Sequence, residues 1–129
     1  LASRLTSISG SSMYIKGSIV TYSNEAKMKF LDVDKEILDT KGAVSPEVAK
    51  QMAEGVRKAV GSDIGVGITG IAGPTGGTDK KPVGLVYIAV AGKDNTVVKE
   101  NVFSGDRARV RYRSTQQALE MIRQYIKNK

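Results

Sequence analysis

The residues that could carry out chemistry in this chain are serines, lysines and arginines, because the sequence contains neither histidine nor cysteine. Without histidine, the Ser-His-Asp triad and the usual general base near neutral pH are excluded. Without cysteine, there is no thiolate nucleophile and no disulfide. A base must therefore be Lys, Asp, Glu, Tyr or water, and a lysine is best suited to activate a serine nucleophile.

A serine and a lysine of this kind lie in the first quarter of the chain, where Ser11 and Ser12 precede Tyr22, Asn24 and Lys27. The pattern predicts a helix with Asn24 as its N-cap, so Lys27 falls near the positive end of the helix dipole. The dipole contributes only ~0.3–1 kcal/mol, whereas lowering a lysine pKa to neutrality requires ~4 kcal/mol. Burial and a nearby arginine must supply the rest. On spacing alone, an ordinary exposed lysine is the alternative.

A stretch rich in glycine, TGIAGPTGGTDKKP at 69–82, is the second candidate. Its glycines expose backbone N–H groups, and the neighbouring hydroxyls and lysines could complete an anion cradle. It lacks the phosphate-loop pattern, so a flexible surface loop is the alternative. The preceding GVGITG at 65–70 matches the dinucleotide fingerprint only formally, because it lies within a predicted strand. Glycines there are better explained by close packing of another element.

Four arginines alternate through 107–113, directly after Ser-Gly-Asp at 104–106. Arg107 stands at a predicted junction between a strand and a helix, where its guanidinium could hold a phosphate or carboxylate with two hydrogen bonds. A solvated basic surface is the alternative. A nucleic-acid surface would interleave aromatic residues with the arginines, and only Tyr112 is present.

The scaffold that must position these residues is a single domain of 129 residues, 40% hydrophobic and 26% charged, with a net charge of +7. No apolar run approaches the ~18–20 residues of a membrane span. Helices and strands alternate without repeats, which predicts an α/β sandwich with a mixed sheet. We predict a buried strand in the later part of 13–22, a helix from 24, a helix at 46–60, strands at 63–69, 82–91 and 96–103, and a helix at 106–126 with Val110, Ala118, Leu119, Ile122 and Ile126 facing inward.

Six short motifs follow one another along the chain: GSS at 10–12, VTYSNEAK at 20–27, GAVS at 42–45, TGIAGP at 69–74, KPVG at 81–84 and FSGDR at 103–107. In this order they resemble the C-terminal domain of the CinA family of competence/damage-inducible proteins. The resemblance runs from the first residue to the last helix.

The resemblance implies a three-layer α/β/α sandwich and an amidohydrolase that converts nicotinamide mononucleotide to nicotinate mononucleotide and ammonia. In these terms Ser12 attacks the carboxamide, Lys27 takes its proton and helps ammonia leave, and Tyr22 orients or relays. Ser11 in place of Ser12 stays open. The remaining implied roles concern substrate binding, with Arg107 on the phosphate, and fall on Asn24, Thr69, Gly70, Gly73, Gly105 and Arg107.

The family pattern also places a Glu-Ser-Cys-Thr-Gly-Gly segment before the helix that opens this sequence at Leu1. Residues 1–129 are therefore expected to form one N-terminally incomplete domain, and losing an oxyanion donor typically costs ~10²–10³ in rate.

We expect a phosphorylated pyridine nucleotide as substrate, no metal or cofactor, and a cytoplasmic homo-oligomer without membrane or nucleic-acid partners. The alternatives are a non-catalytic nucleotide-binding or competence/DNA-damage-related regulatory module, and a nucleic-acid-binding domain that rests only on the +7 charge and the arginine-rich helix.

Overall fold

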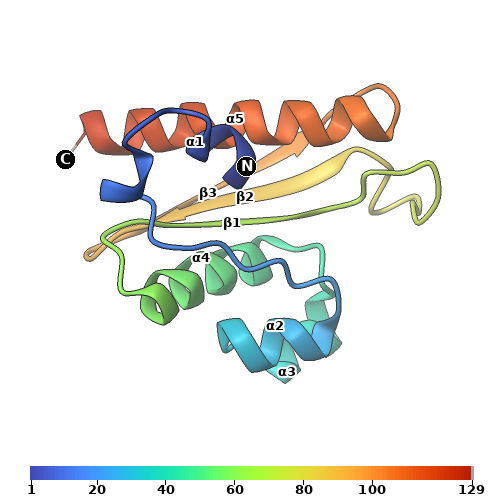
Figure 1. Ribbon diagram of the computed structural model, residues 1–129. Helices are drawn as coiled ribbons and strands as arrows, with labels where there is room; N and C mark the ends of the chain where they lie inside the picture. Colours follow the sequence, from blue (N-terminus) through green and yellow to red (C-terminus); the bar gives the residue numbers. More distant parts are fainter. Residues whose placement is uncertain (129) are drawn as a thin grey trace.

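The computed structural model describes residues 1–128, and its helices and strands form three layers. Helix α5 covers one face of the sheet, α4 lies across the other face, and α2 and α3 pack on the outer side of α4 (Figure 1). This confirms the expected α/β fold. The elements are α1 (Ala2–Thr6), the 3-10 turn η1 (Ser11–Met13), α2 (Asn24–Leu31), α3 (Lys35–Lys41), α4 (Pro46–Val60), β1 (Gly65–Gly70), β2 (Leu85–Ala91), β3 (Thr96–Val102) and α5 (Arg107–Lys127).

The sheet has the order β1-β2-β3, and both of its strand pairs are antiparallel. The expectation of a mixed sheet is therefore wrong for the described strands. A parallel pair needs a crossover that returns the chain to the starting end of the sheet. Here the loop 71–84 re-enters the sheet at the end that it left, and a short turn at 92–95 does the same at the opposite end.

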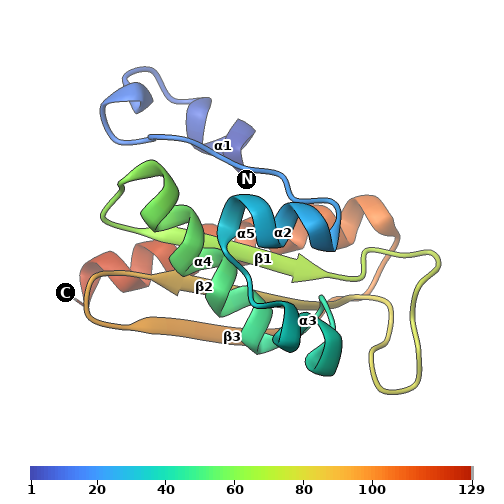
Figure 2. The same ribbon diagram turned by 90° about the horizontal axis from the view of Figure 1, so that it is seen from below.

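The predicted strand within 13–22 is also wrong. This segment is extended and connects η1 to α2 (Figure 2), but it forms no ladder with the described strands. Val20 and Tyr22 are 85% and 88% exposed. Their β-branched and aromatic side chains favour an extended backbone. A strand also needs a neighbouring strand to pair with, and the local sequence does not show whether one is present.

Helix α3 is not among the helices that the sequence predicts. Asp34 caps this helix by accepting a hydrogen bond from the Glu36 amide, and Gly42 ends it with φ +82°. Both residues are typical of helix ends. The helix has only seven residues, however, which is too short for a recognisable apolar periodicity.

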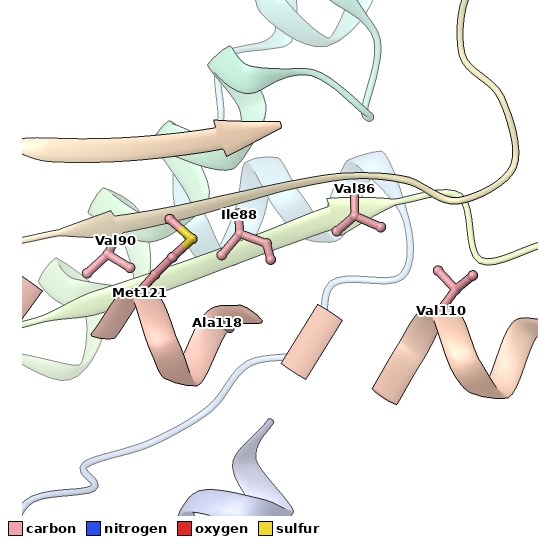
Figure 3. Packing of buried hydrophobic residues seen from close by; sticks show 6 residues of the cluster. All are labelled: Val86, Ile88, Val90, Val110, Ala118 and Met121. Carbon is pink, nitrogen blue, oxygen red and sulfur yellow. The ribbon is translucent and has the colours of Figure 1, made fainter. Parts of the chain in front are cut away.

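The main core lies between β2 and α5 (Figure 3). Ile88, Val90 and Val110 are fully buried, and each such side chain contributes about 1.5–3 kcal/mol to folding. The expected inward positions Val110 and Ala118 are confirmed, whereas Ile126 is 55% exposed because the buried stripe ends at Met121. The side chains in Figure 3 are Val86, Ile88, Val90, Val110, Ala118 and Met121.

Helix α5 is also the longest helix, with 21 residues, and its exposed side is charged. None of the helices in residues 1–128 combines the length and apolarity needed to cross a bilayer.

Helix α4 approaches the sheet closely because two strand residues lack side chains. A Cβ on Gly65 would meet the Ala53 carbonyl, and a Cβ on Gly67 would lie 2.5 Å from the Ala49 carbonyl. Close packing is therefore the role of these glycines, and the dinucleotide fingerprint is accidental. The predicted boundaries of α4 are confirmed, because Ser45 caps its first turn and Gly61 ends it with φ +66°.

Replacing Gly55 with alanine tests the equally close contact between α4 and α2. A Cβ at this position would collide with the main-chain carbonyl of Leu31. Although alanine favours a helix by about 1 kcal/mol over glycine, we expect Gly55→Ala to lower the free energy of unfolding by about 1–3 kcal/mol through overpacking. Chemical denaturation measures this, with the exposed Lys58→Ala as a control expected within about 0.5 kcal/mol of the parent. A Gly55→Ala protein as stable as the parent would contradict the contact.

Candidate functional site

One end of the molecule gathers most of the expected site residues. Helices α2, α4 and α5 all begin at this end, β1 ends there, and the loop 71–84 projects from it (Figures 1 and 2). Helix N-termini carry partial positive charge and unpaired N–H groups, so several of them at one end favour an anion. The three helices are each capped by a side chain, which leaves other first-turn N–H groups available.

Helix α2 is capped by Ser23 rather than by Asn24. The Ser23 hydroxyl accepts a hydrogen bond from the Ala26 amide at 3.1 Å, while Asn24 is the first helical residue and is exposed. Serine and asparagine cap about equally well, so the sequence alone could not separate them. The correction moves Lys27 one position further into the helix.

Lys27 is buried at the start of α2, with 8% of its surface exposed. Its Nζ donates a hydrogen bond to the Thr21 carbonyl at 2.8 Å. Burial lowers the pKa of Lys27 below its ordinary value of 10.5, because desolvation disfavours the ammonium ion. In the described part of the chain no carboxylate lies within ion-pair distance of Lys27 to offset this. The alternative of an ordinary exposed lysine is therefore wrong.

Thr21 and Tyr22 lie just before the cap of α2, on the segment of chain that leads to Lys27. The Thr21 hydroxyl is buried and has no hydrogen-bond partner among residues 1–128. Tyr22, the expected relay, is nearly fully exposed and precedes the cap of α2. Lys27 thus lies beside Thr21, whose buried hydroxyl has no partner among the described residues and is free to hydrogen-bond to a ligand.

Ser12 lies elsewhere. Its turn, η1, is at the opposite end of the extended segment from α2 (Figure 1). Along that segment, Gly17 already lies against Val60 at the C-terminal end of α4. The expected pair of Ser12 with Lys27 is not formed within the chain, and Ser11, buried in the same turn, is no nearer. Spacing of 15 residues in the sequence allowed the pair, but the extended connection holds the two ends apart.

Thr69 and Gly70 form the end of β1. The Thr69 hydroxyl is buried and donates to the Ala43 carbonyl at 2.7 Å, which links β1 to the segment before α4. Gly70 is exposed where the chain enters the loop. Thr69 thus uses its proton on the main chain, and only its lone pairs can face a ligand.

Arg107, the first residue of α5, contacts the glycine loop. Its Nη1 donates to the Gly73 carbonyl at 3.0 Å. Gly105 adopts φ +111° in the turn before the helix, and Asp106 caps the helix by accepting from the Arg109 amide. A guanidinium has further N–H donors beyond the one given to Gly73, so Arg107 could bind an anion and the loop together.

Tyr87 and Glu100 occupy the same row of the sheet as Thr69. The Tyr87 hydroxyl donates to the Glu100 carboxylate at 2.6 Å, and this hydrogen bond raises the pKa of Tyr87 to about 12. Tyr87 is therefore a neutral donor near pH 7 and no base. No cluster of three His, Cys, Asp or Glu side chains that could hold a metal occurs in residues 1–128.

Sequence reasoning missed the part played by Lys81 and by the connection from α3 to α4. The Lys81 Nζ donates to the Lys41 carbonyl at 2.6 Å, and Ser45 donates to the Gly42 carbonyl at 2.9 Å. The only available signal was the presence of KPVG and GAVS among the motifs of the resemblance.

Comparison with known proteins places this arrangement in a family. The model of the CinA C-terminal domain matches residues 1–126. A CinA-like protein of Koribacter versatilis is 56% identical over 126 residues, and one of Syntrophomonas wolfei is 52% identical over 128 residues. These alignments cover 98% and 99% of this chain but only 30% and 31% of the relatives, so the chain spans less than a third of their length.

Solved structures agree with the sequence relatives. The competence/damage inducible protein CihA from Agrobacterium tumefaciens is 41% identical with a TM-score of 0.92, covering 94% of this chain and 74% of that one. A CinA superfamily protein from Escherichia coli is 33% identical with a TM-score of 0.92, covering 96% of this chain and 72% of that one. This chain belongs to the CinA C-terminal domain family.

Proposed function

We propose that this domain takes part in the hydrolysis of the carboxamide of a phosphorylated pyridine nucleotide, which converts nicotinamide mononucleotide to nicotinate mononucleotide and ammonia. The observation that carries the proposal is Lys27. Its amine is buried, its pKa is lowered by burial, and it has no carboxylate partner among the described residues. A lysine whose pKa is lowered gives up its proton more readily than an ordinary lysine, which favours the proton exchange that amide hydrolysis requires.

The surroundings of Lys27 support an anionic ligand. Arg107 and the glycine loop lie at the same end as the start of α2 (Figure 2). The loop offers main-chain N–H groups, and the helix N-termini add partial positive charge. A phosphate held there would leave the uncharged carboxamide group, on the pyridinium ring of the same molecule, to reach a buried amine.

The proposed reaction uses the neutral form of Lys27. An oxygen nucleophile attacks the carboxamide carbon, and its proton passes to Nζ as the tetrahedral intermediate forms. Nζ then returns this proton to the amide nitrogen, the C–N bond breaks, and ammonia leaves. With water as nucleophile, the acid product forms directly; with a hydroxyl side chain, a second attack by water releases it.

The nucleophile must lie within hydrogen-bond reach of Nζ. Ser12 of the same chain does not, because the extended segment separates η1 from α2. The proposal therefore assigns the proton transfer to Lys27 and leaves the nucleophilic oxygen as water or a hydroxyl other than that of Ser12. Tyr22 and Asn24, which flank the cap of α2, are proposed to contact the substrate from its exposed side.

A non-catalytic nucleotide-binding module is the second candidate. The Lys27 amine and the Arg107 guanidinium already hydrogen-bond to main-chain carbonyls, as purely structural cations would. Nucleotide binding measured by calorimetry without ammonia release would favour this candidate over the enzyme.

Lys27→Met tests the proposed base. In the protein at its full encoded length, we expect this variant to lose ammonia release from nicotinamide mononucleotide by at least ~100-fold, because general-base catalysis typically contributes ~10²–10⁴. Lys29→Met, an exposed position two residues along the same helix, is the matched control and should stay within about twofold of the parent. Equal loss in both variants, or in neither, would refute the role of Lys27.

Ser12→Ala tests the separation of the two residues. Because η1 and the start of α2 lie at opposite ends of the extended segment, we expect ammonia release to stay within about twofold of the parent. Ser11→Ala measured alongside it covers the other serine of the turn. A loss comparable to that of Lys27→Met would show that Ser12 is the nucleophile after all.

The lowered pKa of Lys27 also predicts how stability depends on pH. Below the native pKa both states carry the proton, and the native state bears the full cost of the buried charge. Between that pKa and 10.5 the unfolded state binds more protons, so the parent gains stability as pH rises. Denaturant titrations from pH 7 to 10 should therefore show the parent gaining stability relative to Lys27→Met. If the difference in unfolding free energy between the parent and Lys27→Met does not change with pH, the lowered pKa of Lys27 is contradicted.

A further inference from the structure

The glycine loop is attached to the rest of the domain by two cationic side chains. Near its start, Arg107 binds the Gly73 carbonyl, and near its end Lys81 binds the Lys41 carbonyl at 2.6 Å. Between these points, residues 74–80 are exposed. The position of the exposed part therefore depends on where its two ends are held.

Lys81 is held on its main-chain side as well. Its amide donates to the Thr78 hydroxyl at 3.0 Å, and its carbonyl accepts from the Thr78 amide at 2.8 Å. These two hydrogen bonds close residues 78–81 into one turn. When the side chain of Lys81 is fixed, the whole turn is fixed with it.

The acceptor of the Lys81 side chain suits a cation. Lys41 is the last residue of α3, and carbonyls in the last turn of a helix have no intrahelical partner and lie at the negative end of its dipole. An ammonium group there meets an acceptor that would otherwise need water. The contact spans 40 residues of sequence, so it ties two distant parts of the chain together.

Gly42 makes room for this contact. Its φ is +82°, and a Cβ on this residue would lie 2.8 Å from the Lys81 Nζ. The glycine thus serves both as the end of α3 and as the space that the ammonium group occupies. Replacing it would push Nζ away from the Lys41 carbonyl.

The same connection also holds the end of β1. The Ala43 carbonyl accepts from Thr69, and the Gly42 carbonyl accepts from Ser45 at the cap of α4. Three successive carbonyls, those of residues 41 to 43, therefore receive side chains from the loop, from α4 and from β1. The loop, β1 and α4 share this connection as a common support.

We infer that Lys81 is a positioning residue, which holds the glycine loop against the connection between α3 and α4 and thereby sets the loop geometry that receives the substrate phosphate. This inference rests on the proposed function, because the phosphate is the substrate's. The role does not require Lys81 to touch the substrate.

The test compares Lys81→Met with Lys80→Met in the protein at its full encoded length. Lys80 is an exposed neighbour in the same loop, so both variants lose one positive charge, but only Lys81→Met loses the anchor. Because the phosphate is bound equally in ground and transition states, we expect Lys81→Met to raise KM about tenfold and leave kcat within about twofold. Lys81→Arg, which keeps a donor, should bring KM back toward that of the parent. Lys80→Met removes the same charge but keeps the anchor, so its loop should exchange hydrogen as in the parent.

Gly42→Ala tests the contact from its other side, with Gly61→Ala as the control. Both glycines end a helix at positive φ, but a Cβ on Gly61 meets nothing within 4 Å, whereas one on Gly42 meets the Lys81 Nζ. Backbone strain is greater at Gly42 (φ +82°, ψ 164°), a conformation nearly confined to glycine, than at Gly61 (φ +66°, ψ 38°). The double variant Gly42→Ala/Lys81→Met therefore separates strain from loss of the contact, and its KM should equal that of Lys81→Met. Only Gly42→Ala should raise KM in the manner of Lys81→Met, and equal KM values in the two alanine variants would count against the inference.

Hydrogen exchange of the loop separates failure of the inference from failure of the proposed function. The Thr78 amide should exchange at least ~10-fold faster in Lys81→Met than in Lys80→Met, whether or not the protein turns over a nucleotide. Equal exchange in the two variants overturns the inference. Faster exchange with unchanged KM overturns the link between loop and substrate. If Lys81→Met exchanges faster but the parent protein releases no ammonia, the proposed function is overturned and the anchor is established.

Discussion

The close approach of α4 to the sheet is the contact on which the rest of the structure depends. Gly65 and Gly67 have no side chains, so the backbone of α4 at Ala49 and Ala53 lies directly on β1. This contact brings the start of α4 to the end of β1. There the short connection before α4 can offer its carbonyls to Thr69 and to Lys81. A larger residue at either glycine would lift the helix and open both links.

A second glycine contact positions Lys27, the proposed base. Gly55 lets the backbone of α2 pack against α4 at Leu31, and α2 in turn holds Lys27 where it is buried. A buried lysine without a carboxylate partner costs stability, because its charge loses hydration. The packing of α4 and α2 must offset this cost. Such a compromise between stability and function is typical of residues placed for proton transfer.

The sequence predicts the features that depend on residues close together in the chain. The limits of α4 follow from Ser45, Pro46 and Gly61, and the strands follow from their apolar patterns. It does not predict the contacts between residues that are far apart in the chain. Lys81 meets a carbonyl 40 residues away, and Ser12 and Lys27 are separated by an extended segment whose course no local pattern records. The importance of Lys27 could be proposed from sequence, but its burial could not.

The positive charge of the chain is best understood through the contacts that its cations make. Arg107 binds the Gly73 carbonyl, Arg113 approaches the Ser104 hydroxyl, and Arg4 lies over the ring of Tyr112, 5.1 Å from its centre. Tyr112 is the one aromatic residue within the arginine run, and a base would have to displace Arg4 to stack on that face. A nucleic-acid surface needs free cations and free aromatic faces side by side. Here these arginines and the Tyr112 ring already make contacts within the chain. The end of the molecule around Lys27 is therefore the stronger candidate for a ligand site.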